Sequence, residues 1–144
     1  MKKAIVVGAS SGIGLEVARC LMADGWAVGL MARRTTLLEA IRSEYPSNVW
    51  VQPCDVCSTT AVQALEQLTN RMGGVDLYFH AAGIGRQNME LDATTELDTL
   101  DTNVMGFARM VGTAFRYMAV HGGGHIAVIS SIAGVKGLGP APSY

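Results

Sequence analysis

The sequence is poor in cysteine, has little net charge and contains no long apolar run. Its three cysteines, Cys20, Cys54 and Cys57, are an odd number and too few for a disulfide scaffold, so a reducing cytoplasm is the default expectation. Lys and Arg total 11 against 12 Asp and Glu, and the net charge of −1 favours neither a nucleic-acid nor an anionic-membrane surface. No stretch approaches the ~18 consecutive apolar residues of a membrane span. We therefore expect no nucleic-acid partner and no membrane partner.

The first residues do not fit a secretory signal. The apolar run after Lys3 breaks at Gly8 and Ser10, short of the roughly 7–15 residues of a hydrophobic signal core. Hydrophobic residues make up 49% of the chain and charged residues 16%, which is typical of a folded globular protein. With 144 residues the chain can form one domain with a real core, and we treat residues 1–144 as a single domain.

The most informative stretch is the glycine-rich turn Gly8–Gly14, which reads Gly-Ala-Ser-Ser-Gly-Ile-Gly. An apolar run at 4–7 leads into it and an amphipathic run follows, so the predicted order is strand, turn, helix. Gly8 permits a sharp turn, Gly12 leaves room for a pyrophosphate against the backbone, and Gly14 lets the helix pack close to the sheet. The amide groups of the first helical turn would then face the anion. A glycine-rich turn that binds nothing is the alternative.

Downstream, short apolar runs alternate with amphipathic ones. The patterns predict strands at 26–31, 49–53, 75–79 and 125–129, helices at 15–23, 35–45, 58–72 and 97–120, a turn at 46–48, and loops at 84–92 and 132–144. This alternation predicts right-handed βαβ units and hence an α/β fold, a doubly wound parallel sheet of Rossmann type in three αβα layers. Ligands of such sheets bind outside the carboxyl ends of the strands, where the strand order reverses.

Two details of the predicted helices are specific enough to test. Thr35 or Thr36 would cap the second helix, with Leu37, Leu38 and Ile41 facing inward.

Two glycines, Gly106 and Gly112, lie inside the long helix predicted at 97–120, and each costs roughly 1 kcal/mol relative to alanine. Their positions predict that this helix packs closely against another surface.

The motifs, taken in order, resemble the short-chain dehydrogenase/reductase family along the whole chain. Gly8, Gly12 and Gly14 match the glycine motif of that family. Asp55 follows the third predicted strand and matches the acidic residue that holds the adenine amine. The turn His80–Gly83 stands where the family commonly has Asn-Asn-Ala-Gly, and its last two residues match. The resemblance thus implies a dinucleotide-binding domain.

The same resemblance implies the catalytic residues. Asn103 matches the active-site asparagine of the long helix, and Ser131 matches the catalytic serine. Tyr144 lies 13 residues beyond Ser131 (144 − 131 = 13), which is the usual separation between serine and catalytic tyrosine. The implied roles are acid/base for Tyr144, hydrogen bonding to the substrate oxygen for Ser131, and holding a relay water for Asn103.

The family's tyrosine opens a Tyr-x-x-x-Lys motif, whose lysine would fall four residues past Tyr144. A free tyrosine has a pKa of about 10, and a neighbouring ammonium lowers it. The family also continues with more helix and two further strands. We therefore expect the chain to be the N-terminal part of a longer protein, without the C-terminal strands of the sheet.

The residues after the second predicted strand indicate the cofactor. Enzymes that prefer NAD place a carboxylate here to bind the ribose hydroxyls, whereas this chain has Arg33 and Arg34. Guanidinium groups suit a 2′-phosphate, so NADP(H) is the expected cofactor, with Arg33 favoured and Ser10 as a further contact. Two solvated arginines at a helix start are the alternative. The expected cofactor contacts are Gly8, Ser10, Ser11, Gly12, Ile13, Gly14, Arg33, Arg34, Asp55, Val56, Ala82 and Gly83.

The implied function is NADP(H)-dependent hydride transfer between the nicotinamide and an alcohol or ketone substrate, in a homo-oligomer by family analogy. A non-catalytic NADP(H)-binding or sensing module is the main alternative. A methyltransferase on a similar sheet is disfavoured because its cofactor carries no phosphate to meet the arginines. The Cys54-x-x-Cys57 motif lacks a second ligand pair, so we expect no metal.

Overall fold

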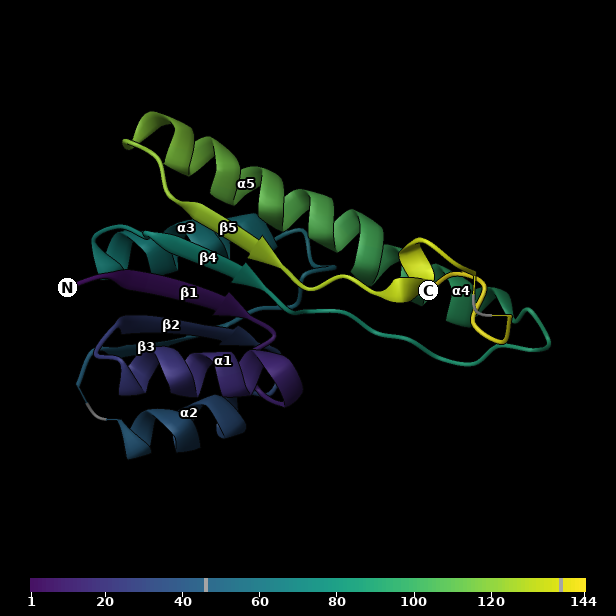
Figure 1. Cartoon of the computed structure of the whole chain (residues 1–144), viewed down its shortest axis with the longest axis horizontal. Coiled ribbons are helices and arrows are strands. Elements are labelled where there is room, and N and C mark those ends of the chain that lie inside the picture. Colours follow the sequence, from purple (N-terminus) through teal and green to yellow (C-terminus); the bar gives the residue numbers. More distant parts are fainter. Residues whose placement is uncertain (46, 138) are drawn as a thin grey trace.

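The computed structural model describes residues 1–45, 47–137 and 139–144. Five parallel strands form one sheet in the order β3-β2-β1-β4-β5 (Figure 1). The strands are β1 (Lys3–Val7), β2 (Ala27–Ala32), β3 (Val49–Pro53), β4 (Leu77–His80) and β5 (His125–Val128). The predicted doubly wound parallel sheet is confirmed. Pro46 of the predicted turn and Leu138 of the predicted tail loop lie outside the described residues.

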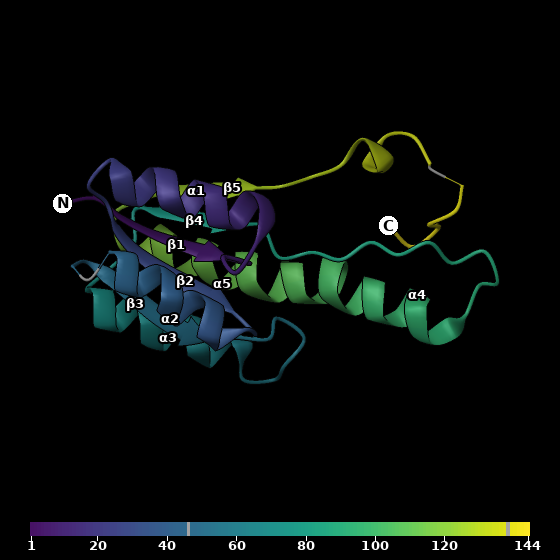
Figure 2. The same cartoon turned by 90° about the horizontal axis from the view of Figure 1, so that it is seen from below.

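Helices cover both faces of the sheet, in the three layers predicted (Figures 1 and 2). Strand β1 shows why, because successive side chains point to opposite faces. Val6 belongs to the core beneath α1 and α2, whereas Ile5 and Val7 belong to the core beneath α3 and α5. The helices are α1 (Gly12–Ala23), α2 (Thr35–Glu44), α3 (Ala61–Met72), α4 (Ala93–Leu100) and α5 (Phe107–Val120).

The predicted long helix is one continuous rod that extends past the sheet (Figure 2). It consists of α4, a π-helical segment η1 (Asp101–Gly106) and α5. It begins at Ala93 rather than at the predicted Leu97. The apolar pattern did not reveal the first turn, because this turn is polar and carries no apolar period. Asp92 caps this turn: its Oδ2 accepts 2.9 Å hydrogen bonds from the amide and the hydroxyl of Thr95.

The two glycines of this rod differ in their surroundings. A Cβ on Gly106 would lie 2.8 Å from Cγ2 of Val56, so the close packing predicted for this position is confirmed. Among the described residues, and apart from the backbone of its own helix, a Cβ on Gly112 would meet only Nη1 of Arg116, at 3.3 Å and on the same helix. For Gly112 the prediction of close packing against another surface is therefore wrong.

Other boundaries depart slightly from the sequence patterns. Helix α1 begins at Gly12, three residues earlier than predicted, and the strand ends shift by at most two residues. Arg34, not a threonine, occupies the N-cap position of α2 and makes no side-chain cap. Leu38 and Ile41 face inward as predicted, but Leu37 is 40% exposed. The tail after β5 contains one 3-10 turn, η2 (Ile132–Gly134). Among the described residues, no helix combines the length and apolarity needed to span a bilayer.

Candidate active site

The carboxyl ends of all five strands meet at one edge of the sheet. The strand order reverses between β1 and β4, since β2 and β3 extend to one side of β1 while β4 and β5 lie on the other. Two cavities open at this edge, of about 180 Å³ and about 300 Å³. The segment directly after β4, Ala81–Ile84, lines both of them. The two cavities therefore adjoin at the reversal point.

The smaller cavity is lined by most of the predicted cofactor contacts, and for that reason we call it the cofactor cavity. Nine of the twelve line it: Gly8, Ser10, Ser11, Arg33, Arg34, Asp55, Val56, Ala82 and Gly83. Gly12, Ile13 and Gly14 do not line it, and Ile13 is 58% exposed. Thr102 and Ile84 also contribute to the wall. Sequence reasoning missed both, although Thr102 directly precedes the predicted Asn103.

Each glycine of the turn is required, or tolerated, for a different structural reason. Gly8 has φ +90°, and a Cβ there would lie 2.7 Å from the amide nitrogen of Ala82. A Cβ on Gly14 would collide with the carbonyl oxygen of Gly8, which confirms the predicted close approach of helix and strand. Gly12 has φ +57°, and a Cβ on it would meet no heavy atom of the described chain within 4 Å. The space beside Gly12 is thus open.

The start of α1 is suited to an anion. Its N-cap residue, Ser11, makes no side-chain cap, and its first turn carries no acidic residue. The first amides are therefore not occupied by a capping side chain, and the positive end of the helix dipole adds to their attraction for negative charge. These observations fit the diphosphate of a dinucleotide.

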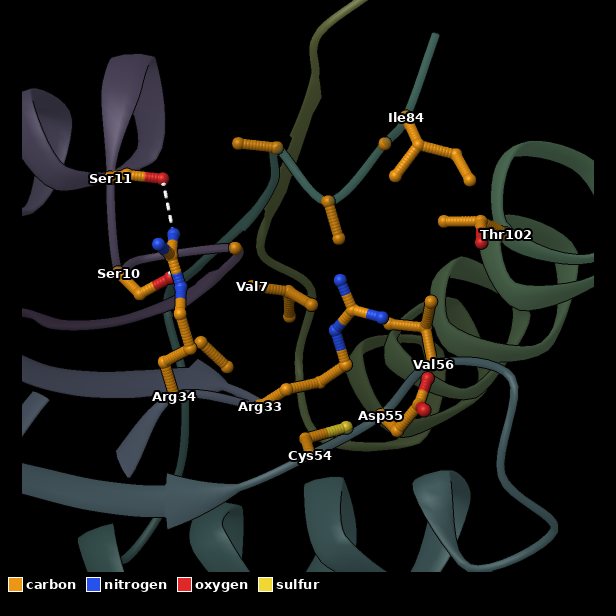
Figure 3. Close-up of a pocket in the computed structure, with 15 residues that line it drawn as sticks. Val7, Ser10, Ser11, Arg33, Arg34, Cys54, Asp55, Val56, Ile84 and Thr102 are labelled. Carbon is orange, nitrogen blue, oxygen red and sulfur yellow. Dashed lines mark hydrogen bonds between the residues drawn. The ribbon is translucent and has the colours of Figure 1, made fainter. Parts of the chain in front are cut away.

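The two arginines after β2 take different directions (Figure 3). Nη2 of Arg34 donates to the hydroxyls of Ser10 and Ser11, at 3.0 and 2.7 Å, and so ties the end of β2 to the glycine turn. Arg33 extends into the cavity, toward the side where Val56 lies (Figure 3). Neither arginine forms an ion pair with a carboxylate within the part of the chain that the structure describes. Two guanidinium groups thus remain available to a phosphate.

The opposite wall follows β3. Oδ1 of Asp55 accepts a 3.0 Å hydrogen bond from the amide of Cys57, which holds the loop in a turn. Cys54 is 8% exposed, and burial, with a smaller contribution from Asp55, raises the pKa of its thiol to about 11. The thiol therefore stays protonated at neutral pH. No group of three His, Cys, Asp or Glu side chains among the described residues could hold a metal ion.

The larger cavity brings together the three predicted catalytic residues, and for that reason we call it the substrate cavity. Asn103, Ser131 and Tyr144 all line it, although they come from η1, the segment after β5 and the end of the chain. Sequence reasoning missed the other lining residues outside the shared segment: His80, Gly85, Phe107, Ile129, Ser130 and Gly134. A signal for His80 was present, since this residue occupies an asparagine position of the resembled motif.

Asn103 uses both ends of its side chain on one residue. Its Oδ1 accepts from the amide of Ile84 at 2.9 Å, and its Nδ2 donates to the Ile84 carbonyl at 2.7 Å. The side chain thus pins the segment that separates the two cavities. The role predicted for Asn103 as a holder of water stays a prediction.

Ser131 is oriented by the turn that follows it. Its Oγ accepts a 3.1 Å hydrogen bond from the amide of Ala133 and so caps η2. A hydroxyl that accepts in this way keeps its proton for donation. The Ser131 hydroxyl can therefore donate to an oxygen atom in the substrate cavity.

Tyr144 lies against a glycine of the loop after β4. A Cβ on Gly85 would lie 2.8 Å from Cδ2 and 2.9 Å from Cε2 of the Tyr144 ring. A further contact holds the tail to this loop, because the amide of Asn88 donates to the Pro140 carbonyl at 2.7 Å. The position of Tyr144 therefore depends on a residue without a side chain at 85.

Comparison with known proteins identifies the family of this chain. The family profile described as short chain dehydrogenase matches residues 2–144. The chain belongs to the short-chain dehydrogenase family. An uncharacterized oxidoreductase of Mycobacterium tuberculosis is 33% identical over 95% of this chain and 57% of its own length. The human 3-oxoacyl-[acyl-carrier-protein] reductase is 32% identical over 94% of the chain and 59% of its own length.

Solved structures show the same likeness. The crystal structure of an actinorhodin polyketide ketoreductase variant with NADPH superposes with a TM-score of 0.91 at 31% identity. The match covers 99% of this chain and 58% of the ketoreductase.

A third relative by sequence, a glycine betaine reductase of Emericella nidulans, is 37% identical over 96% of this chain and 12% of its own length. This short-chain dehydrogenase chain thus spans less than two thirds of each of these relatives, which their names describe as oxidoreductases or reductases.

Proposed function

We propose that this chain forms the NADP(H)-binding and catalytic side of an oxidoreductase that interconverts an alcohol and a ketone. The observation that carries this proposal is the shared wall Ala81–Ile84. A ligand that fills both cavities would meet the phosphate-binding features at one end and Ser131 and Tyr144 at the other. That arrangement suits a dinucleotide with a reactive ring.

The cofactor cavity and the start of α1, which directly follows the lining residue Ser11, offer chemical partners for three parts of NADP(H). The uncapped amides of α1 would bind the diphosphate. Arg33 and Arg34 would bind the 2′-phosphate, for which a guanidinium provides charge and two parallel donors. The carboxylate of Asp55 would accept a hydrogen bond from the adenine amine. When bound, the cofactor supplies or accepts the hydride.

The substrate cavity supplies the proton chemistry. Tyr144 donates its phenolic proton to the substrate oxygen during reduction and takes a proton back during oxidation. Ser131 donates a hydrogen bond to the same oxygen and stabilises the charge that develops there. Asn103 keeps the dividing segment in place through Ile84. The residues thus divide into a proton carrier, an orienting donor and a positioning group.

A combined binding and turnover experiment tests this function. We expect calorimetric titration to show NADPH binding, and a panel of ketones to cause a loss of NADPH absorbance. Tyr144→Phe should abolish the absorbance change while leaving the NADPH affinity unchanged. Binding without oxidation by any ketone would favour the second candidate, a non-catalytic NADP(H)-binding module. Absence of NADPH binding would contradict both candidates.

A further inference from the structure

The loop Cys54–Cys57, which forms one wall of the cofactor cavity, lies against the long helical rod. Three rod residues in successive turns contact this loop, namely Thr102, Gly106 and Arg109. Only Thr102 among them also lines the cavity. The other two contact the wall from behind.

Arg109 provides the strongest of these contacts. Its Nη1 donates a 2.8 Å hydrogen bond to the carbonyl oxygen of Val56, across 53 residues of sequence. Val56 is 6% exposed. A buried carbonyl that loses its donor is destabilised, and hydrogen bonds from charged donors are among the stronger ones in proteins. The bond thus resists any movement of Val56 away from the rod.

Gly106 and Thr102 hold the same loop by other means. A Cβ on Gly106 would come within 2.8 Å of Cγ2 and 3.1 Å of Cβ of Val56. The rod and the loop can therefore approach this closely only because residue 106 has no side chain. Sγ of Cys57 lies 3.4 Å from Oγ1 of Thr102. Contacts at Val56 and Cys57, in the second half of the loop, therefore fix its distance from the rod.

We propose that Arg109 and Gly106 are positioning residues. They hold Val56 in place, and through Val56 they fix the position of the adenine end of the cofactor cavity. This inference rests on the proposed function, because it takes the Asp55–Val56 wall as the adenine contact. A loop that moves away from the rod would shift the Asp55 carboxylate next to Val56. NADPH and NADH carry the same adenine, so a change at the rod should weaken both equally.

The test is a pair of matched substitutions on the rod. Arg109→Met removes the donor to Val56, and Arg116→Met is its control, because Arg116 is exposed and its Nη2 bonds to Thr113 of the same helix. We expect calorimetry to show about tenfold weaker binding of both NADPH and NADH by R109M, the size expected for losing a hydrogen bond from a charged donor. R116M should bind like the wild type, and R109K, which keeps a donor, should recover part of the affinity.

A second pair keeps the proposal testable if R109M does not fold. Gly106→Ala should weaken both cofactors several-fold by pushing Val56, whereas Gly112→Ala should leave the affinities unchanged. Equal affinities of G106A and G112A, of R109M and R116M, or of R109K and R109M would overturn the positioning role while leaving the proposed function intact. A wild-type chain that binds neither cofactor would instead overturn the proposed function and this inference together.

Discussion

The hydroxyl of Tyr78 and Nδ1 of His80 lie 2.8 Å apart inside the protein, on the same face of β4. Tyr78 is fully buried and His80 is 2% exposed. Phe107 of α5 packs edge-on against the imidazole, with ring centroids 5.3 Å apart. Burial lowers the pKa of His80 to about 4, an effect only partly offset by the nearby Ala82 carbonyl. The imidazole is therefore neutral in the folded protein at neutral pH.

This burial predicts a specific loss of stability in acid. The pKa of His80 falls from 6.5 in the unfolded chain to about 4 in the folded one, so the unfolded state takes up the proton first as the pH falls. The free energy of unfolding should decrease between pH 6.5 and pH 4, by at most about 3 kcal/mol from this group. Urea denaturation at several pH values measures it.

Two histidine variants isolate the contribution of His80. His80→Asn should reduce the slope of stability against pH in that window, whereas His121→Asn, at an exposed position, should leave the slope unchanged. An unchanged slope in H80N would show that other groups dominate acid unfolding.

The two arginines after β2 should decide cofactor preference. Arg33→Ala should weaken NADPH binding by about 10- to 100-fold, because it removes charged donors to the 2′-phosphate, and NADH binding should change little. Arg34→Ala also removes the bonds to Ser10 and Ser11 of the glycine turn, so it should weaken both cofactors, and NADPH more than NADH. Arg42→Ala, a change at an exposed residue in the last turn of α2, is the control. Equal losses for NADPH and NADH would argue against a 2′-phosphate contact.

The Gly85 position should control the Tyr144 ring. Gly85→Ala would place a Cβ within 2.8 Å of the ring, so the ring must move. We expect a changed Tyr144 signal in NMR spectra of protein with ¹³Cζ-labelled tyrosine, together with slower ketone reduction. Gly137→Ala serves as the control, since a Cβ there meets nothing within 4 Å among the described residues. An unmoved Tyr144 signal in G85A would show that the ring lies elsewhere in solution.

The Asn103 side chain should govern the order of the segment between the cavities. Asn103→Ala removes both hydrogen bonds to Ile84 and should lower the free energy of unfolding by about 2 kcal/mol. Hydrogen exchange of the Ile84 amide should accelerate, because that amide loses its acceptor. Asn70→Ala, at an exposed site on α3, should change neither quantity. Unchanged exchange at Ile84 in N103A would contradict the positioning role.

The βα alternation, the parallel sheet and the strand–turn–helix at Gly8–Gly14 follow from the sequence alone, because apolar periodicity and glycine spacing are local properties of the chain. Nine of the predicted cofactor residues reach one cavity for the same reason: in a parallel sheet, residues after each strand meet at one edge. The apolar pattern did not predict the start of the long helix at Ala93, because the helix begins with a side-chain cap from Asp92 and not with an apolar period.

Only the tertiary structure decided which residues support the site. Arg109 meets Val56, Tyr144 meets Gly85, and Asn103 meets Ile84. Each pair joins segments that lie far apart along the chain, and no local pattern encodes their distance. The same physics separates Gly106 from Gly112: two glycines with identical propensity differ because only one of them faces the loop after β3.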